Sequence, residues 1–548
     1  MYAVRVSKTA PHAYRSLREA VTDERLDGSE DLYVHIEPGE YEETRSIRVF
    51  RQLLVVPTEG PGTVRISAAG DDGLFHVRGA LELYGLLVRS ASAEPVVTAS
   101  EAGRVKLADC VFDTASALRL GGRHSDDEVV NCRFENGGIV WHGGGGQLSD
   151  CHFERAVLHI QYGAEATVHS VEFTGYLAGG ENPLPTLGIR GATAKVTDCV
   201  LTDAGPVGSS TAVNVSEKGR ARFENLSFTS DRTAAISVVH EGTRAEFSGL
   251  LVEGRQDPEA DGESSVSVYL GAEAFIGNAR ITGGRRNGLT LNSGARVILD
   301  GLTIEDVRVH GISVKESALN GRSLVFRGVG GNAVRGTDAR LTLSDVEIGD
   351  QPPETEGAWC GLRAWQGSLE VDGLRVSGLT GAAVGAWGCR ANLTGVTVEN
   401  SRSGIGAEED STVRVDGFVC SRVEANMVTA LSGSVVEVVD AKLTDNQGYG
   451  LAFADAGDLT LRSVSISGSG YNAVGVDNGG SLTLEDVDVR NSSSAGLMVA
   501  DAESRATLRR SRITGNALAG VQAHPDAVVE MRDVVLRDNE GGDWVYSE

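Results

Sequence analysis

The chain has 548 residues, and 50 lysines and arginines against 76 aspartates and glutamates give it a formal net charge of −26. A field of that sign repels phosphate backbones and anionic lipid headgroups, so we expect neither nucleic-acid nor membrane partners. Seventy glycines and only 5% aromatic residues indicate many tight turns, and seven cysteines are too few for a disulfide scaffold. The first residues carry no apolar secretory segment, and we expect a cytoplasmic protein.

The N-terminal region predicts a short helix followed by a strand. Tyr14, Leu17 and Val21 place apolar side chains on one face of a helix over residues 14–21. Alternating apolar residues over 32–36 then predict a strand, which runs into the sequence Pro-Gly-Glu-Tyr-Glu-Glu at 38–43. We expect the helix to cap the first turn of the structure that follows and to block edge-to-edge pairing.

A repeat of about 22 or 23 residues begins near residue 75 and continues to residue 523. Its marker is an apolar residue, any residue and a second apolar residue, as in 75–77, 118–120, 289–291 and 497–499. Each period carries two further pairs of this kind, for example 105–107 and then 110–112. Three short alternating strands in every period predict one turn of a solenoid, repeated about twenty times.

Small or polar residues mark the bend between the second and third strands of a period. They tolerate left-handed backbone angles, and they are Asp109, Asn131, Asp150, Asp198, Gly301, Asp345, Gly373, Gly395, Gly417 and Asp486. Stacking in register also predicts ladders of like side chains through the core. One ladder contains Phe112, Phe134, Phe153 and Phe173, and a second contains Cys110, Cys132, Cys151 and Cys199.

This pattern resembles the right-handed parallel β-helix of the pectin-lyase-like superfamily over nearly the whole chain. The opening helix, strand and PG-x-Y-x-E run are similar to the start of pectinesterase-like β-helix proteins. The resemblance implies an all-β fold, a single-stranded right-handed parallel β-helix (solenoid) of about twenty coils with a short N-terminal capping helix. We expect one structural domain, with residues 1–72 as cap helix and first coils, 73–540 as β-helix and 541–548 as C-terminal cap or tail.

One face of the solenoid is the predicted binding surface. Three long connections, at 176–186, 255–264 and 350–358, precede the same strand of the repeat and are expected to overhang this face. Trp365 and Trp387 are 22 residues apart, hence on neighbouring coils, where two indoles form a platform for a sugar or a protein side chain. The alternative is that both rings fold over to cover the solenoid or pack beneath the loop that contains Pro352. The predicted ligand-binding residues are Trp365, Trp387, Tyr269 and Glu408.

Cationic and imidazole side chains are the candidates for chemistry. Lys315, Arg335 and Arg363 are predicted to stabilise charge or transfer protons if the chain is an enzyme acting on an anionic polymer. His142 and His159 lie at outward positions of adjacent coils and are the candidates for a metal site. We nevertheless predict no metal and no other cofactor, because the repeat places the remaining nearby histidines on different faces.

The sequence contains no complete catalytic motif, and the polygalacturonase and pectinesterase signatures are absent. We therefore predict a non-catalytic cytoplasmic binding or scaffold protein that holds a protein, peptide or glycan on this face. The alternative is a carbohydrate-active enzyme, a polysaccharide lyase, glycoside hydrolase or epimerase, that uses the same face. Whether the chain is catalytic, and its oligomeric state, stay open at this point.

Overall fold

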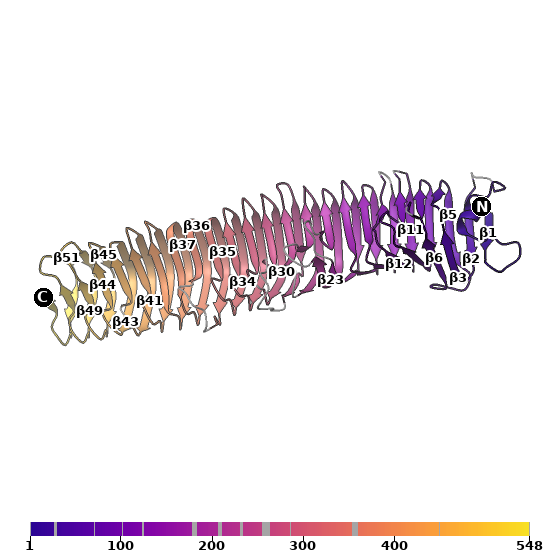
Figure 1. The fold of residues 1–548 in the computed structure, drawn as a ribbon. Coiled ribbons are helices and arrows are strands. Elements are labelled where there is room, and N and C mark those ends of the chain that lie inside the picture. The colour runs from indigo at the N-terminus through magenta and orange to yellow at the C-terminus, as the bar shows by residue number, and fades with distance from the viewer. Residues whose placement is uncertain are drawn as a thin grey trace. The chain divides into compact units, whose positions relative to one another are not determined.

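The computed structural model describes residues 2–546, except 27–29, 71, 101, 123–124, 178–183, 207–210, 231–233, 255–263, 285, 353–359 and 449. These residues form two compact units, Met1–Ala279 and Arg280–Glu548. Each unit is a parallel β-solenoid with almost no helix, and the two units together contain about 21 turns (Figure 1). The solenoid predicted from the 22-residue period is therefore confirmed.

Most turns of the first unit contain three short strands, although β23 (Thr193–Pro206) and β25 (Arg220–Ser230) each continue through the bend as one strand. One turn consists of β7 (Phe75–Val77), β8 (Ala80–Tyr84) and β9 (Leu86–Ser90), and the next of β10 (Val97–Ala99), β11 (Arg104–Ala108) and β12 (Val111–Thr114). Every strand pairs in parallel with its equivalent one turn later, so that β7 pairs with β10, β8 with β11 and β9 with β12. The alternation of buried and exposed residues along each strand then directs one face into the core.

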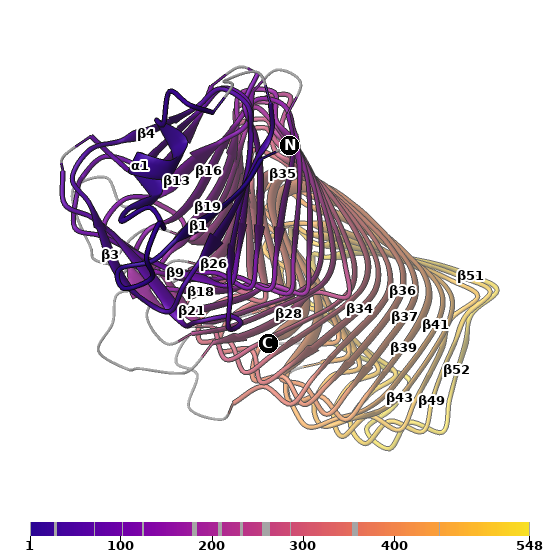
Figure 2. The same cartoon turned by 90° about the vertical axis from the view of Figure 1, so that its right-hand side faces the viewer.

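In the second unit several strands continue through the bend between the second and third strands. β35 (Val334–Gly349), β36 (Cys360–Ser377) and β37 (Ala382–Glu399) each span a large part of a turn and pair in parallel. Shorter strands follow, including β38 (Ser403–Glu408), β40 (Val428–Leu431) and β42 (Ala452–Asp455). Figure 2 shows the coils of this unit one behind another.

The bends are in the left-handed region of backbone space, as the sequence predicts. Asp109 has a φ of 56° and Asn131 a φ of 50°, while the glycine bend at Gly373 has a φ of 77°. The other seven predicted bend residues also have positive φ. Short polar side chains and glycine are the residues that accept this geometry at low cost, which explains their recurrence at one position.

The predicted ladders lie in the core. The rings of Phe112, Phe134, Phe153 and Phe173 follow one another with centroid distances of 5.3, 4.7 and 5.0 Å. All four are fully buried. All seven cysteines are buried and free, and burial raises the pKa of the Cys199 thiol to about 11, so this thiol is unionised at neutral pH.

One short helix lies near the N-terminus. α1 (Leu17–Val21) is shorter than the predicted 14–21, because the Ser16 side chain accepts a hydrogen bond from the Glu19 N–H and starts the helix there. Leu17 and Ala20 are buried, and α1 packs against β1 (Tyr2–Val6), β2 (Leu32–Ile36) and β3 (Gly39–Glu43). Its action as a cap and the predicted division of the chain at residues 72 and 540 stay predictions.

Glu43 connects α1 to the first turn. Its carboxylate is buried and accepts the Leu17 N–H at 2.7 Å, so we expect Glu43→Ala to lower the free energy of unfolding by about 1–2 kcal/mol. Burial raises the pKa of Glu43 above its ordinary 4.5, so the folded state holds this proton more tightly than the unfolded state. The contribution of this carboxyl to stability therefore falls as the pH rises from about 4.5 through the raised pKa.

Glu43→Gln keeps an acceptor oxygen and does not titrate, so it is the control for this effect. Urea unfolding near pH 4.5 and at neutral pH should show a smaller pH dependence for Glu43→Gln than for the wild type. An unchanged pH dependence would show that Glu43 is not the group responsible.

Candidate functional site

A row of outward side chains crosses the first strands of successive turns in the second unit. Starting at β31 (Leu289–Asn292) and β33 (Ile312–Lys315), and continuing through β35 to β38, the residues in register are Thr290, Ser313, Arg335, Arg363, Gly385 and Gly406. Neighbouring members belong to hydrogen-bonded strands, so their backbones are about 4.8 Å apart. The row therefore places two arginines side by side, followed by two glycines.

Arg335 and Arg363 have no acidic partner in the part of the chain that the structure describes. Among the residues that the structure describes, no carboxylate forms an ion pair with either guanidinium, and Arg363 Nε is buried without a hydrogen-bond partner. Burial and the neighbouring charge of Arg363 lower the pKa of Arg335. In a chain with a net charge of −26, this pair is a local concentration of positive charge. Guanidinium groups of this kind are able to hydrogen-bond carboxylates.

The two predicted tryptophans border this pair but adopt different positions. Trp365 and Trp387 are in register on β36 and β37, and the Arg363 guanidinium carbon is 5.9 Å from the first ring centroid and 4.7 Å from the second. Trp387 folds back over Gly385 on its own strand. A methyl group built on Gly385 would overlap the indole ring, so the absence of a side chain there makes room for it. Trp365 is 39% exposed and is the indole that remains open to solvent.

Gly385 makes this arrangement of Trp387 testable. We expect Gly385→Ala to displace the indole and to change the tryptophan emission spectrum, with a loss of about 0.5–1 kcal/mol from the contact with Arg363. Gly406→Ala is the matched control one turn later, because a methyl group there would have the Thr429 hydroxyl at 3.2 Å as its nearest neighbour. Equal spectra for Gly385→Ala and Gly406→Ala would contradict the described position of Trp387.

His310 belongs to the site and is not predicted by the sequence. It is buried, its Nδ1 accepts the Asn332 N–H at 3.1 Å, and its Nε2 is 3.3 Å from Arg335 Nη1. Burial, together with the charges of Arg335 and Arg363, lowers its pKa to about 4, so the imidazole is neutral at physiological pH. The only signal in the sequence is its place two residues before the strand at Ile312, and a single histidine there is indistinguishable from a core residue.

The other predicted residues of this face lie in a second row beside the arginines. Lys315, Thr337, Trp365, Trp387 and Glu408 are in register on consecutive turns. The Lys315 ammonium is exposed and 3.8 Å from the Glu316 carboxylate, so its charge is partly compensated. Glu408 is half-buried at the far end of the row, next to Trp387.

Tyr269 and the two histidines belong to the first unit. Tyr269 ends β29 (Val266–Tyr269), half-buried and in register with Val239. His159 is buried on β19 (Val157–Gln161), where its Nε2 is 2.8 Å from the Pro185 carbonyl oxygen and burial lowers its pKa. His142, at the end of β16 (Gly138–His142), stacks on Tyr162 with 4.8 Å between ring centroids.

The two histidines occupy different rows of neighbouring strands, since His159 is opposite Val140 and His142 is opposite Gln161. Across the described ranges, no group of three or more histidine, cysteine or acidic side chains is arranged to hold a metal ion. Most of the three long connections at 176–186, 255–264 and 350–358 lies outside the described residues, so their predicted overhang stays a prediction. The only helix in the described part of the chain is too short to cross a membrane.

Comparison with solved structures gives distant matches. A double mutant of the periplasmic alginate epimerase AlgG has 9% identity and a TM-score of 0.27, over 63% of this chain and 77% of that one. The PL6 family alginate lyase AlyGC has 10% identity and a TM-score of 0.29, over 99% and 100%. The catalytic domain of a GH87 alpha-1,3-glucanase in complex with nigerose has 10% identity and a TM-score of 0.23, over 97% and 68%.

No curated protein matches the chain. Residues 381–548 match the family model described as a right-handed beta helix region. The parallel register within each unit agrees with that match and with the predicted β-helix repeat. The chain is thus a parallel β-solenoid repeat protein, and its last part, residues 381–548, matches a right-handed beta helix region.

Proposed function

We propose that the chain binds acidic glycans, built from sugars that carry carboxylate groups, on the outward face of β33, β35, β36 and β37. The observation that carries this proposal is the pair of adjacent guanidiniums, Arg335 and Arg363, without acidic partners in the described structure. A guanidinium binds a carboxylate through two parallel hydrogen bonds, which a lysine cannot reproduce.

The indoles favour a sugar over the other predicted ligands. An acidic peptide or protein would meet the same two arginines, but the exposed ring of Trp365 also offers a flat apolar surface beside them. The apolar face of a sugar ring stacks on such a surface while its carboxylate reaches the guanidiniums. The repeat of the strands, about 4.8 Å, lets a polymer run along the row with one sugar per turn.

The proposal is tested by titrating the protein with a galacturonate hexamer and with its fully methyl-esterified, uncharged form. We expect saturable binding of the acid form only, and weaker binding as the salt concentration rises, because the ligand charge is what the arginines recognise. Equal affinity for both forms, or no binding of the acid form, would contradict the proposal.

A catalytic role is the second candidate, and Lys315 supports it. Its ammonium lies on the turn before Arg335 and one row across, so a carboxylated sugar on the arginines would lie beside a group able to exchange protons. Elimination across a uronate ring produces a conjugated double bond, which ultraviolet absorbance detects. A steady rise in absorbance with polygalacturonate that is lost in Lys315→Ala would replace the non-catalytic proposal with a lyase.

The scaffold role is part of the same proposal, since a rigid row of equivalent positions can hold an extended ligand. A cytoplasmic location, and the exclusion of nucleic-acid and membrane partners, rest on the sequence charge and composition alone.

A further inference from the structure

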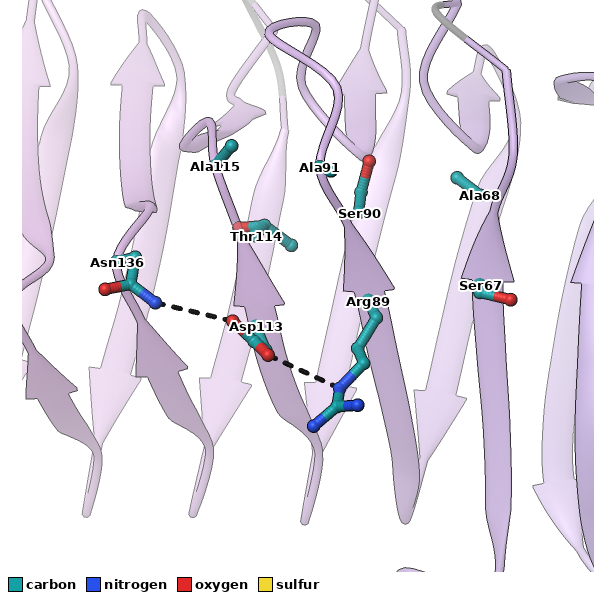
Figure 3. Close-up of a pocket in the computed structure, with 9 residues that line it drawn as sticks. All are labelled: Ser67, Ala68, Arg89, Ser90, Ala91, Asp113, Thr114, Ala115 and Asn136. Carbon is teal, nitrogen blue, oxygen red and sulfur yellow. Dashed lines mark hydrogen bonds and ion pairs between the residues drawn. The ribbon is translucent and has the colours of Figure 1, made fainter.

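A groove crosses the surface of the first unit where the third strands of successive turns end. It has a volume of about 560 Å³ and lies at the ends of β6 (Val64–Ala68), β9, β12 and β15 (Arg133–Glu135) (Figure 3). Small-molecule sites commonly have volumes of about 300–1,000 Å³, so the groove is large enough for a short oligosaccharide. It involves none of the residues of the acidic-glycan site proposed above.

Small side chains create the room in this groove. Ala68, Ser90 and Thr114 are in register on β6, β9 and β12, and Ala91 and Ala115 follow on the connections. The hydroxyl groups of the floor already take part in local hydrogen bonds, since Thr114 donates to the Ser116 carbonyl at 2.9 Å and Ser90 accepts the Ser92 N–H at 3.2 Å. The floor therefore supplies space and shape, and the polar recognition must come from the wall.

The wall carries three polar side chains with hydrogen-bonding capacity left over. The Asp113 carboxylate lies between Arg89, whose Nε is 3.3 Å away, and Asn136, whose Nδ2 is 3.4 Å away (Figure 3). Both contacts are at the long end for hydrogen bonds, and a carboxylate has about four lone-pair positions. Within the described residues Arg89 makes no second ion pair, so the remaining N–H groups of its guanidinium are available.

The composition of the lining defines the ligand. The charges of Arg89 and Asp113 cancel, so a charged ligand gains no net attraction from the wall. Among the described residues, no aromatic or large aliphatic side chain lines the groove, so an apolar ligand gains little contact there. A neutral, hydroxyl-rich molecule satisfies both conditions, because Asp113 can accept from two adjacent hydroxyls while Arg89 and Asn136 donate to their oxygens.

We propose that this groove is a second glycan site, specific for a neutral sugar. It differs in unit, in strand and in ligand charge from the site around Arg335 and Arg363. Ligand binding at one site can therefore be shown or disproved without affecting the proposal for the other site.

The test uses the full chain and hexasaccharides of β-1,4-linked glucose, mannose and xylose, titrated separately. Asp113→Ala removes the central acceptor, and Ala91→Trp fills the groove without changing the polar wall. We expect at least one hexasaccharide to bind the wild type and to lose tenfold or more in affinity in both variants.

Matched controls are available on the same turns. Ala93→Trp adds the same ring to the same connection outside the groove lining, and Glu128→Ala removes a carboxylate paired with Lys106 at 3.2 Å on the neighbouring strands β14 (Asp126–Val130) and β11. Both controls, and the double variant Arg335→Ala/Arg363→Ala, should bind as the wild type does. The proposal is overturned if no hexasaccharide binds, if the groove variants bind normally, or if the controls lose the same affinity.

Discussion

Phe134→Ala is expected to lower the free energy of unfolding by about 3–5 kcal/mol, the largest loss of stability foreseen for a single core side chain. Phe134 is fully buried between Phe112 and Phe153, at centroid distances of 5.3 and 4.7 Å. Removing the ring leaves a cavity inside a stack that neighbouring turns hold in register, so the gap cannot close by moving one strand. Urea unfolding followed by circular dichroism measures this loss.

Val111→Ala is the control, because Val111 is on the same strand as Phe112 but faces outward and is only half-buried. Its loss should stay below about 1 kcal/mol. Similar losses for Phe134→Ala and Val111→Ala would mean that the phenylalanine ladder is not a packed core, and the register of the first unit, on which the groove depends, would be wrong.

Arg335→Ala/Arg363→Ala is expected to abolish measurable binding of a galacturonate hexamer. Each single variant should weaken binding at least tenfold, about 1.4 kcal/mol, because each removes charge-assisted hydrogen bonds to a carboxylate. The stability should fall by only about 0.5–1 kcal/mol for each arginine, because neither guanidinium forms an ion pair within the described structure and Arg363 loses only its contact with the indoles. Isothermal titration calorimetry of the two single variants and the double variant measures the loss of affinity for the hexamer.

The control variant for this experiment loses the same number of positive charges at a different place in the same unit. Arg322 and Arg327 are on β34 (Ala318–Arg327) of the same unit, and they pair with Asp300 at 2.7 Å and Glu347 at 3.0 Å. Arg322→Ala/Arg327→Ala also removes two positive charges, so it reports the general electrostatic effect. Equal loss of binding in this control would show that the hexamer senses overall charge and not the Arg335–Arg363 pair.

The sequence predicts the fold well because the solenoid is periodic. The 22-residue spacing, the alternation within each strand and the recurring bend residues each describe the same turn many times, so local errors average out. The ladder of Phe112 to Phe173 and the left-handed angle at Asp109 are direct consequences of that repetition.

Features that occur once are the ones the sequence does not predict. Asp127 lies in an acidic run typical of an exposed turn, yet it is fully buried and accepts hydrogen bonds from Val105 N, Gly121 N and Trp141 Nε1 at 2.8–3.1 Å. Burial raises its pKa, and these donors oppose that rise. Its partners come from different turns, and no periodic pattern encodes them.

The candidate site also combines features that the repeat predicts with features that it does not predict. The period places Arg335 beside Arg363 and Trp365 beside Trp387, as register alone requires. It does not specify that Trp387 folds onto Gly385, or that His310 contacts Arg335, because both depend on rotamers and on the connections between strands.

A crystal structure of the chain with a bound galacturonate hexamer is the most direct measurement. The proposed function predicts a sugar carboxylate within hydrogen-bonding distance of both Arg335 and Arg363, with a sugar ring against Trp365. A hexamer bound on other strands, or a face that stays without ligand at saturating hexamer, would contradict it.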